Sequence, residues 1–200
     1  MVKVKICGLS RKCDIDFVNV EKPEYIGFVF ADSQRKVTPE QAFELRKHLV
    51  QEIIPVGVFV NEAIENILLL IQKGVIDIVQ LHGNEDENYI KRLKELTDKP
   101  VIKAISVQNF GDVQKWESTT ADYLLLDNQS GGTGQTFDWR LIGETQKPYI
   151  LAGGLDASNV VQAINETAPF AVDVSSGVET DGFKDPIKIK KFIRMVKCGQ

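Results

Sequence analysis

The stretch that decides the fold is Tyr123-Leu124-Leu125-Leu126-Asp127, a short apolar run that ends in a single carboxylate. Such a run predicts a buried parallel strand whose last residue lies at the C-terminal edge of its sheet. In β/α proteins the functional groups gather at that edge. The sequence therefore predicts that Asp127 is a functional acid.

Glycine-rich sequence follows this strand as Gly131-Gly132-Thr133-Gly134, and Phe137-Asp138-Trp139 comes next. Glycines allow backbone angles that are closed to other residues, so the segment can bend tightly and approach a ligand. We predict a hinged lid over the site, anchored by the two aromatic residues. A plain turn between a strand and a helix is the simpler alternative.

Composition favours one globular domain that acts on a small molecule. The chain has 200 residues, of which 43% are hydrophobic, which is enough for one substantial core. Its net charge is -4 and both signs are interspersed, so no basic surface for nucleic acid is expected. No apolar stretch is long enough for a membrane span. Three cysteines are too few for a disulfide framework, which predicts a cytoplasmic protein.

Strand-like segments recur along the whole chain at regular intervals. They begin near positions 2, 25, 54, 76, 100, 122, 148 and 170, with a spacing of roughly 22 to 29 residues, the length of one βα unit. Eight such units predict an α/β fold, the eight-stranded parallel (β/α)8 TIM barrel, as one domain over residues 1–200. An open doubly wound sheet is the second choice.

Helix signals follow most of these strands. Thr38 can cap a helix whose first residue is proline, and Asn61 can cap the next one. A further helix is expected around residues 113–116. After the seventh strand, Asp156 or Ser158 is the expected cap, and the last helix is expected over residues 186–196.

Alternation along the strands predicts which side chains face the barrel axis. On the first strand the apolar residues should face the helices, which turns Lys5 and Cys7 inward. The same reasoning turns Lys103 and Asp173 inward. A buried lysine must be paired, so we predict that Lys5 or Lys103 lies near Asp173.

Cys7 and Asp127 end the first and sixth strands, so a closed barrel would bring both to one mouth. A thiolate and a carboxylic acid across a pocket form a general base and a general acid. Lys5 is expected to lower the pKa of the Cys7 thiol. Cys13 and Cys198 are interpreted as ordinary residues.

Small residues after the seventh and eighth strands predict a phosphate site. Backbone N–H groups, serine hydroxyls and a short helix N-terminus at these two positions bind phosphate in barrels of this kind. Two plain glycine turns are the alternative. The expected phosphate-binding residues are Gly153, Gly154, Ser175, Ser176 and Gly177.

Other polar residues complete the expected site. Arg35 can hold a substrate carboxylate with two parallel hydrogen bonds. Gln80, His82 and Asp173 are expected to line the substrate cavity. Two scattered histidines predict no metal site. Gly132-Thr133-Gly134 is not a dinucleotide fingerprint, because Phe137 stands where a third glycine belongs.

Together these motifs resemble the phosphoribosylanthranilate isomerase family over nearly the whole chain. The Lys-Ile-Cys-Gly start combined with Asp-Val-Ser-Ser-Gly-Val-Glu near the end is the most specific pair. The motifs in chain order are Lys5-Ile6-Cys7-Gly8-Leu9, Gly27-Phe28-Val29-Phe30, Val58-Phe59-Val60-Asn61, Gln80-Leu81-His82-Gly83, Gly131-Gly132-Thr133-Gly134 with Phe137-Asp138-Trp139, Leu151-Ala152-Gly153-Gly154-Leu155 and Asp173-Val174-Ser175-Ser176-Gly177-Val178-Glu179.

The resemblance implies a cofactor-independent Amadori rearrangement in tryptophan biosynthesis. N-(5-phosphoribosyl)anthranilate would become 1-(2-carboxyphenylamino)-1-deoxyribulose 5-phosphate. Asp127 matches the family acid that protonates the ribose ring oxygen, and Cys7 matches the base that removes the C2 proton. Arg35 matches the residue that faces the anthranilate carboxylate. A monomer and a homodimer both fit the sequence.

Other phosphate-binding barrels fit the sequence less well. Indole-glycerol-phosphate synthase would offer a lysine acid, and the sugar isomerase of histidine biosynthesis would have an aspartate in place of Cys7. A ribulose-phosphate epimerase would need metal-binding histidines. A non-catalytic phosphate-binding barrel would have no use for Cys7 opposite Asp127. An isomerase of related aminoaldose phosphates is also compatible.

Overall fold

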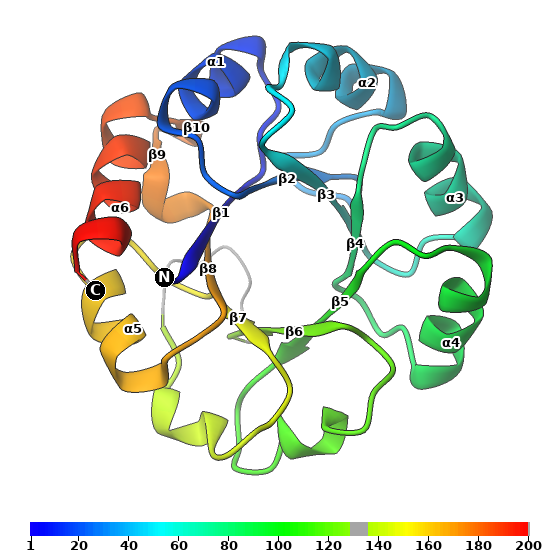
Figure 1. The fold of residues 1–200 in the computed structure, drawn as a ribbon, viewed down its shortest axis with the longest axis vertical. Helices are drawn as coiled ribbons and strands as arrows, with labels where there is room; N and C mark the ends of the chain where they lie inside the picture. Colours follow the sequence, from blue (N-terminus) through cyan, green and yellow to red (C-terminus); the bar gives the residue numbers. More distant parts are fainter. Residues whose placement is uncertain (129–135, 200) are drawn as a thin grey trace.

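A computed structural model describes residues 1–128 and 136–199, and eight parallel strands form a closed barrel within them (Figure 1). This confirms the predicted fold. The expected lid glycines, Gly131 to Gly134, lie outside the described residues. The barrel strands are β1 Lys3–Cys7, β2 Tyr25–Val29, β3 Ile54–Phe59, β4 Ile78–Leu81, β5 Val101–Ser106, β6 Tyr123–Asp127, β7 Tyr149–Leu151 and β8 Ala171–Val174.

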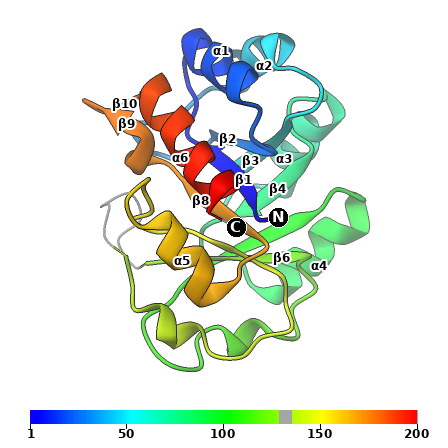
Figure 2. The same cartoon turned by 60° about the vertical axis from the view of Figure 1, so that its left-hand side comes forward.

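Helices surround the barrel, and none of those in the described part of the chain is long and apolar enough to cross a membrane. A short antiparallel hairpin, β9 Glu179–Thr180 and β10 Phe183–Lys184, projects beyond β8 beside the last helix (Figure 2). The α-helices are α1 Lys12–Glu21, α2 Pro39–His48, α3 Ile64–Gln72, α4 Glu87–Leu96, α5 Val160–Thr167 and α6 Pro186–Cys198, and the 3-10 helices are η1 Gln114–Trp116, η2 Trp139–Ile142 and η3 Ser176–Val178.

Local capping explains where α2 begins. The Thr38 hydroxyl accepts a hydrogen bond from the Gln41 N–H at 3.2 Å, and the Gln41 side chain accepts one from the Thr38 N–H at 2.9 Å. Two of the orphan N–H groups of the helix start are thus satisfied within four residues. The predicted cap is confirmed.

Three helix predictions were wrong. Asn61 does not cap α3, because it adopts a φ of 51° and its side-chain oxygen accepts a hydrogen bond from the Asn84 N–H. The N-cap residue of α5 is Asn159, and neither Asp156 nor Ser158 caps this helix. The Asp156 carboxylate accepts hydrogen bonds from Ser158 instead. The expected helix around residues 113–116 is only the single turn η1.

Apolar side chains form two buried clusters on the two sides of the strands. The inner cluster fills the barrel and includes Tyr25, Val56, Ile102 and Leu125. The outer cluster packs between strands and helices, with Ile6 among its members. This division follows from the alternation of side chains along each strand. It leaves the C-terminal ends of the strands free to carry polar groups.

The two buried lysines have different partners. Lys5 Nζ lies 3.0 Å from Asp173 Oδ1, which confirms the predicted pairing. Lys103 was predicted to face the axis, and this was wrong, because β5 turns Ile102 into the barrel and Lys103 toward the helices. There Lys103 Nζ lies 2.9 Å from Glu85 Oε2 and 2.6 Å from the Gly83 carbonyl oxygen.

Replacing Glu85 by alanine should strongly destabilise the fold. Lys103 and Glu85 side chains are 2% and 1% exposed, so the variant leaves a buried cation without its carboxylate. Breaking such a pair costs about 3–5 kcal/mol. Urea unfolding measures the loss. Glu52→Ala, which removes an exposed partner of Lys22, should leave the unfolding midpoint unchanged, and equal effects of the two variants would contradict the assignment.

Candidate active site

Cys7 and Asp127 both end barrel strands at the same rim, as the strand pattern predicted. In the closed ring, β6 is followed by β7 and β8, and β8 pairs with β1. The turns after β7 and β8 therefore lie between the two residues. Gly153 belongs to the first of these turns and Ser175 to the second.

The Cys7 thiol is buried against β2. A Cβ on Gly27 would lie 2.6 Å from Cys7 Sγ, so only glycine leaves room for the sulfur. Burial raises the pKa of the thiol, and the positive charges of Lys5 and Lys184 oppose this shift only in part. The expected lowering of the thiol pKa by Lys5 is thus present but outweighed by desolvation.

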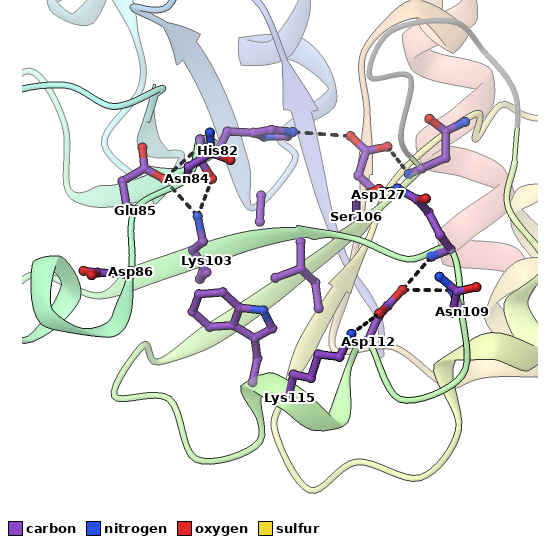
Figure 3. A pocket seen from close by; sticks show the side chains of 16 residues that line it. His82, Asn84, Glu85, Asp86, Lys103, Ser106, Asn109, Asp112, Lys115 and Asp127 are labelled. Atoms are coloured by element: carbon purple, nitrogen blue, oxygen red, sulfur yellow. Dashed lines mark hydrogen bonds and ion pairs between the residues drawn. The ribbon is translucent and has the colours of Figure 1, made fainter.

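Asp127 is oriented by His82, which follows β4, and by the main chain of the next residue, Asn128. The Asn128 N–H donates to Asp127 Oδ1 at 2.8 Å, and His82 Nε2 lies 3.5 Å from Asp127 Oδ2. Figure 3 shows the His82 ring pointing toward the Asp127 carboxylate. Gln80 Nε2 lies 2.9 Å from His82 Nδ1. Donation by this amide assigns the remaining ring proton to Nε2, which faces Asp127.

A cavity of about 700 Å³ opens beside Asp127, over β4, β5 and β6 (Figure 3). His82, Ser106 and Asp127 line it on the side of the barrel. Trp116 and Lys115 line it on the side of η1. A volume of this size fits a small-molecule ligand.

The predicted phosphate residues occupy two turns in direct contact. Gly153 and Gly154 adopt φ values of 80° and 65°, a backbone form that favours glycine. A Cβ on Gly177 would lie 2.0 Å from the Leu155 carbonyl oxygen, so the β8 turn packs against the β7 turn. The Ser175 hydroxyl donates to the Cys7 carbonyl oxygen at 3.0 Å. The predicted residues therefore come together beside Cys7.

Arg35 reaches the same rim but is held by a residue that the sequence reasoning did not assign. Its Nε and Nη2 atoms donate to the two oxygens of Glu179, each at 2.7 Å. Lys184 donates to Glu179 Oε1 and to the Ser175 carbonyl oxygen. Glu179 stands in a quoted motif without a role, and Lys184 belongs to none of the quoted motifs.

The arrangement brings a carboxylate, a thiol and two glycine turns together on one rim. Among residues 1–128 and 136–199, no group of three or more histidine, cysteine, aspartate or glutamate side chains is placed to hold a metal ion.

The family model for N-(5'-phosphoribosyl)anthranilate isomerase matches residues 4–195. The chain belongs to this isomerase family.

Relatives of the isomerase family match this chain from end to end. The isomerase of Endomicrobium trichonymphae is 47% identical over 201 residues, covering 98% of this chain and 99% of its own. The crystal structure of the isomerase from Thermotoga maritima has a TM-score of 0.90 and 40% identity, covering 99% and 100% of the two chains.

A further isomerase structure, in complex with reduced 1-(o-carboxyphenylamino)-1-deoxyribulose 5-phosphate, has a TM-score of 0.87 and 38% identity over 99% of this chain and all of its own. The predicted aldose–ketose isomerase of tryptophan biosynthesis is confirmed.

Replacing Gly153 by alanine should impair turnover through Asp127. The new Cβ would lie 2.7 Å from Asp127 Oδ1 and 3.0 Å from the Asn128 N–H nitrogen, which displaces the carboxylate. Gly74→Ala is the matched control, because Gly74 also has a positive φ, of 65°, but has open space around its Cβ position. Both variants carry backbone strain, so equal kcat values for the two would contradict the prediction.

Proposed function

We propose that this isomerase uses Asp127 as the general acid and Cys7 as the general base of the Amadori rearrangement. The substrate is N-(5-phosphoribosyl)anthranilate and the product is 1-(2-carboxyphenylamino)-1-deoxyribulose 5-phosphate. One observation carries the assignment: the phosphate turns lie between the two residues and contact both. Gly153 packs against Asp127, and Ser175 bonds to the Cys7 main chain.

Anchoring the phosphate between the acid and the base places the ribose across the rim. Asp127 then donates a proton to the ribose ring oxygen, the bond from C1 to that oxygen breaks, and the anilino nitrogen forms a Schiff base with C1. Cys7 removes the proton from C2, the C2–H electron pair forms the C1=C2 double bond, and the C=N pair moves to the nitrogen to give the enolamine. Tautomerisation of the enolamine gives the ketone. Each step needs only proton transfer.

The phosphate group is assigned to the backbone of the two turns. Gly153, Gly154, Ser176 and Gly177 supply N–H groups there, and the tight packing of the turns excludes side chains from the cradle. The hydroxyl of Ser175 is engaged with Cys7 and Lys184, so we assign its main-chain N–H to the phosphate.

Arg35 takes its role from the family resemblance, and the other predicted residues take roles that follow from their contacts. Arg35 is assigned to the anthranilate carboxylate. His82 orients Asp127, and Gln80 orients His82. Asp173 Oδ1 lies 3.0 Å from Lys5 Nζ and holds this lysine beneath Cys7. Asp173 is assigned to the floor of the substrate site.

The wider setting is also part of the proposal. We take residues 1–200 as one catalytic domain that binds a small molecule and requires no cofactor, nucleic acid or membrane. The three cysteines are free, as a reducing cytoplasm requires. The isomerase of Thermotoga maritima is dimeric, and a homodimer is one of the two states predicted for this chain, beside the monomer.

Removing either proton-transfer group should nearly abolish turnover. Cys7→Ala and Asp127→Asn should each lower kcat by about 10²- to 10⁴-fold, the usual worth of general acid–base catalysis. Freshly generated phosphoribosylanthranilate is fluorescent, and loss of its fluorescence measures the rate. Cys198→Ala is the control, because Cys198 is exposed at the end of α6. No activity above background in the unmodified protein would favour a binding barrel.

The pH dependence of kcat/KM should reflect the buried thiol. Burial raises the pKa of Cys7, so the thiolate that acts as base forms only at higher pH. The rise of kcat/KM with pH should therefore continue above about 8.5, the ordinary value for cysteine. The Cys13→Ala/Cys198→Ala variant should keep the same profile. A plateau reached below the ordinary value would remove Cys7 from the role of base.

A further inference from the structure

The hairpin of β9 and β10 carries a buried acid–base pair outside the barrel itself. Glu179 and Lys184 face each other in the hairpin register, and their side chains are 6% and 1% exposed. Lys184 Nζ donates to Glu179 Oε1 at 2.5 Å. Burial of these two charges in so short a hairpin indicates that the pair has a role, because desolvating each charge costs several kcal/mol.

Glu179 also binds Arg35, which lies in the turn after β2, and only β1 separates β2 from β8 in the closed ring. The two carboxylate oxygens accept from Nε and Nη2, each at 2.7 Å. This bidentate pairing uses Nε and one hydrogen of Nη2. Of the three remaining N–H hydrogens, one on Nη1 and one on Nη2 lie side by side along the end edge of the guanidinium, which has the geometry to bind a second carboxylate in a bidentate way.

Electrostatics keeps Glu179 ionised in this place. Burial raises the pKa of the Glu179 carboxyl, but hydrogen bonds from Arg35 and Lys184 outweigh it, so the pKa lies below its ordinary value. One carboxylate is shared by two cations, and the cluster keeps a net positive charge. That charge suits a site that receives an anionic group.

The cluster of Arg35, Glu179 and Lys184 contacts the rim that carries Cys7 at two places. Lys184 donates to the Ser175 carbonyl oxygen at 3.0 Å, and Ser175 bonds to the Cys7 carbonyl oxygen. Arg35 passes directly over Gly8, where an added Cβ would lie 2.5 Å from Arg35 Cδ. The guanidinium is thus held at one place beside the general base.

We propose that Glu179 is the positioning residue of Arg35, with Lys184 as its support. Glu179 presents the Nη1–Nη2 edge of the guanidinium to the substrate carboxylate and so contributes to specificity for a substrate that bears one. The inference rests on the proposed role of Arg35 in binding that carboxylate. Glu179 itself touches no reacting atom.

A double-mutant cycle tests the proposal. Glu179→Gln replaces one acceptor by a donor that faces Arg35, and should raise KM for phosphoribosylanthranilate about 10- to 100-fold, the worth of a charge-assisted pair. The value of kcat should change less than about 3-fold, because Cys7 and Asp127 keep their surroundings. In the Arg35→Ala background, Glu179→Gln should have no further effect on KM.

Inhibition by inorganic phosphate separates positioning from a structural role. Phosphate occupies the turns after β7 and β8 only, so its inhibition constant should stay the same in Glu179→Gln. Weaker inhibition, with a lower kcat, would overturn the proposal in favour of a general disturbance of the rim. Glu44→Gln, which breaks an exposed pair with Lys47, is the matched control and should leave every constant unchanged.

A double variant controls for misfolding caused by an unpaired buried charge. Glu179→Gln leaves Lys184 buried without its carboxylate, whereas Glu179→Gln/Lys184→Met removes both charges together and should show the same rise in KM. If Arg35→Ala alone leaves KM unchanged, the assignment of Arg35 to the substrate carboxylate fails. If Arg35→Ala raises KM and neither Glu179 variant does, only the inference about Glu179 is wrong.

Discussion

Closure of the barrel is the constraint on which the rest of the structure depends. The first strand pairs with the last, in a register that sets Lys5 beside Asp173 and Ile6 beside Val174. Closure removes the free edges that an open sheet would expose. It also brings residue 7 next to residue 175, which are 168 positions apart in the chain, within one hydrogen bond. Cys7 and the turn after β8 meet only because the sheet closes.

Buried charged side chains around this closed sheet form ion pairs with side chains of opposite charge. Lys5 is paired with Asp173 inside the barrel, and Lys103 is paired with Glu85 outside it. At the rim, Glu179 is shared by two cations. Each group costs desolvation that mutual attraction offsets only with good geometry. The pair outside the barrel fastens a loop to a strand, whereas the groups near the rim also set the electrostatic surroundings of the thiol.

Much of the fold was predictable because the signals are local. Each strand is a short apolar run, and the spacing of these runs reveals the eight repeated units. The capping box of α2 lies within four residues. Predictions failed where a distant partner overrode the local preference. Asn61 accepts a hydrogen bond from the Asn84 N–H instead of capping a helix. Lys103 faces outward, where it forms an ion pair with Glu85.

By itself the sequence determined the barrel, the family, and the placement of Cys7 and Asp127 at strand ends, because all three follow from short motifs and their order. The tertiary structure alone decided the surroundings of these groups. It showed that burial outweighs Lys5 at the Cys7 thiol, and that Glu179 holds Arg35. The physical reason is that pKa values and ion pairs depend on distances through space, between residues that the chain keeps far apart.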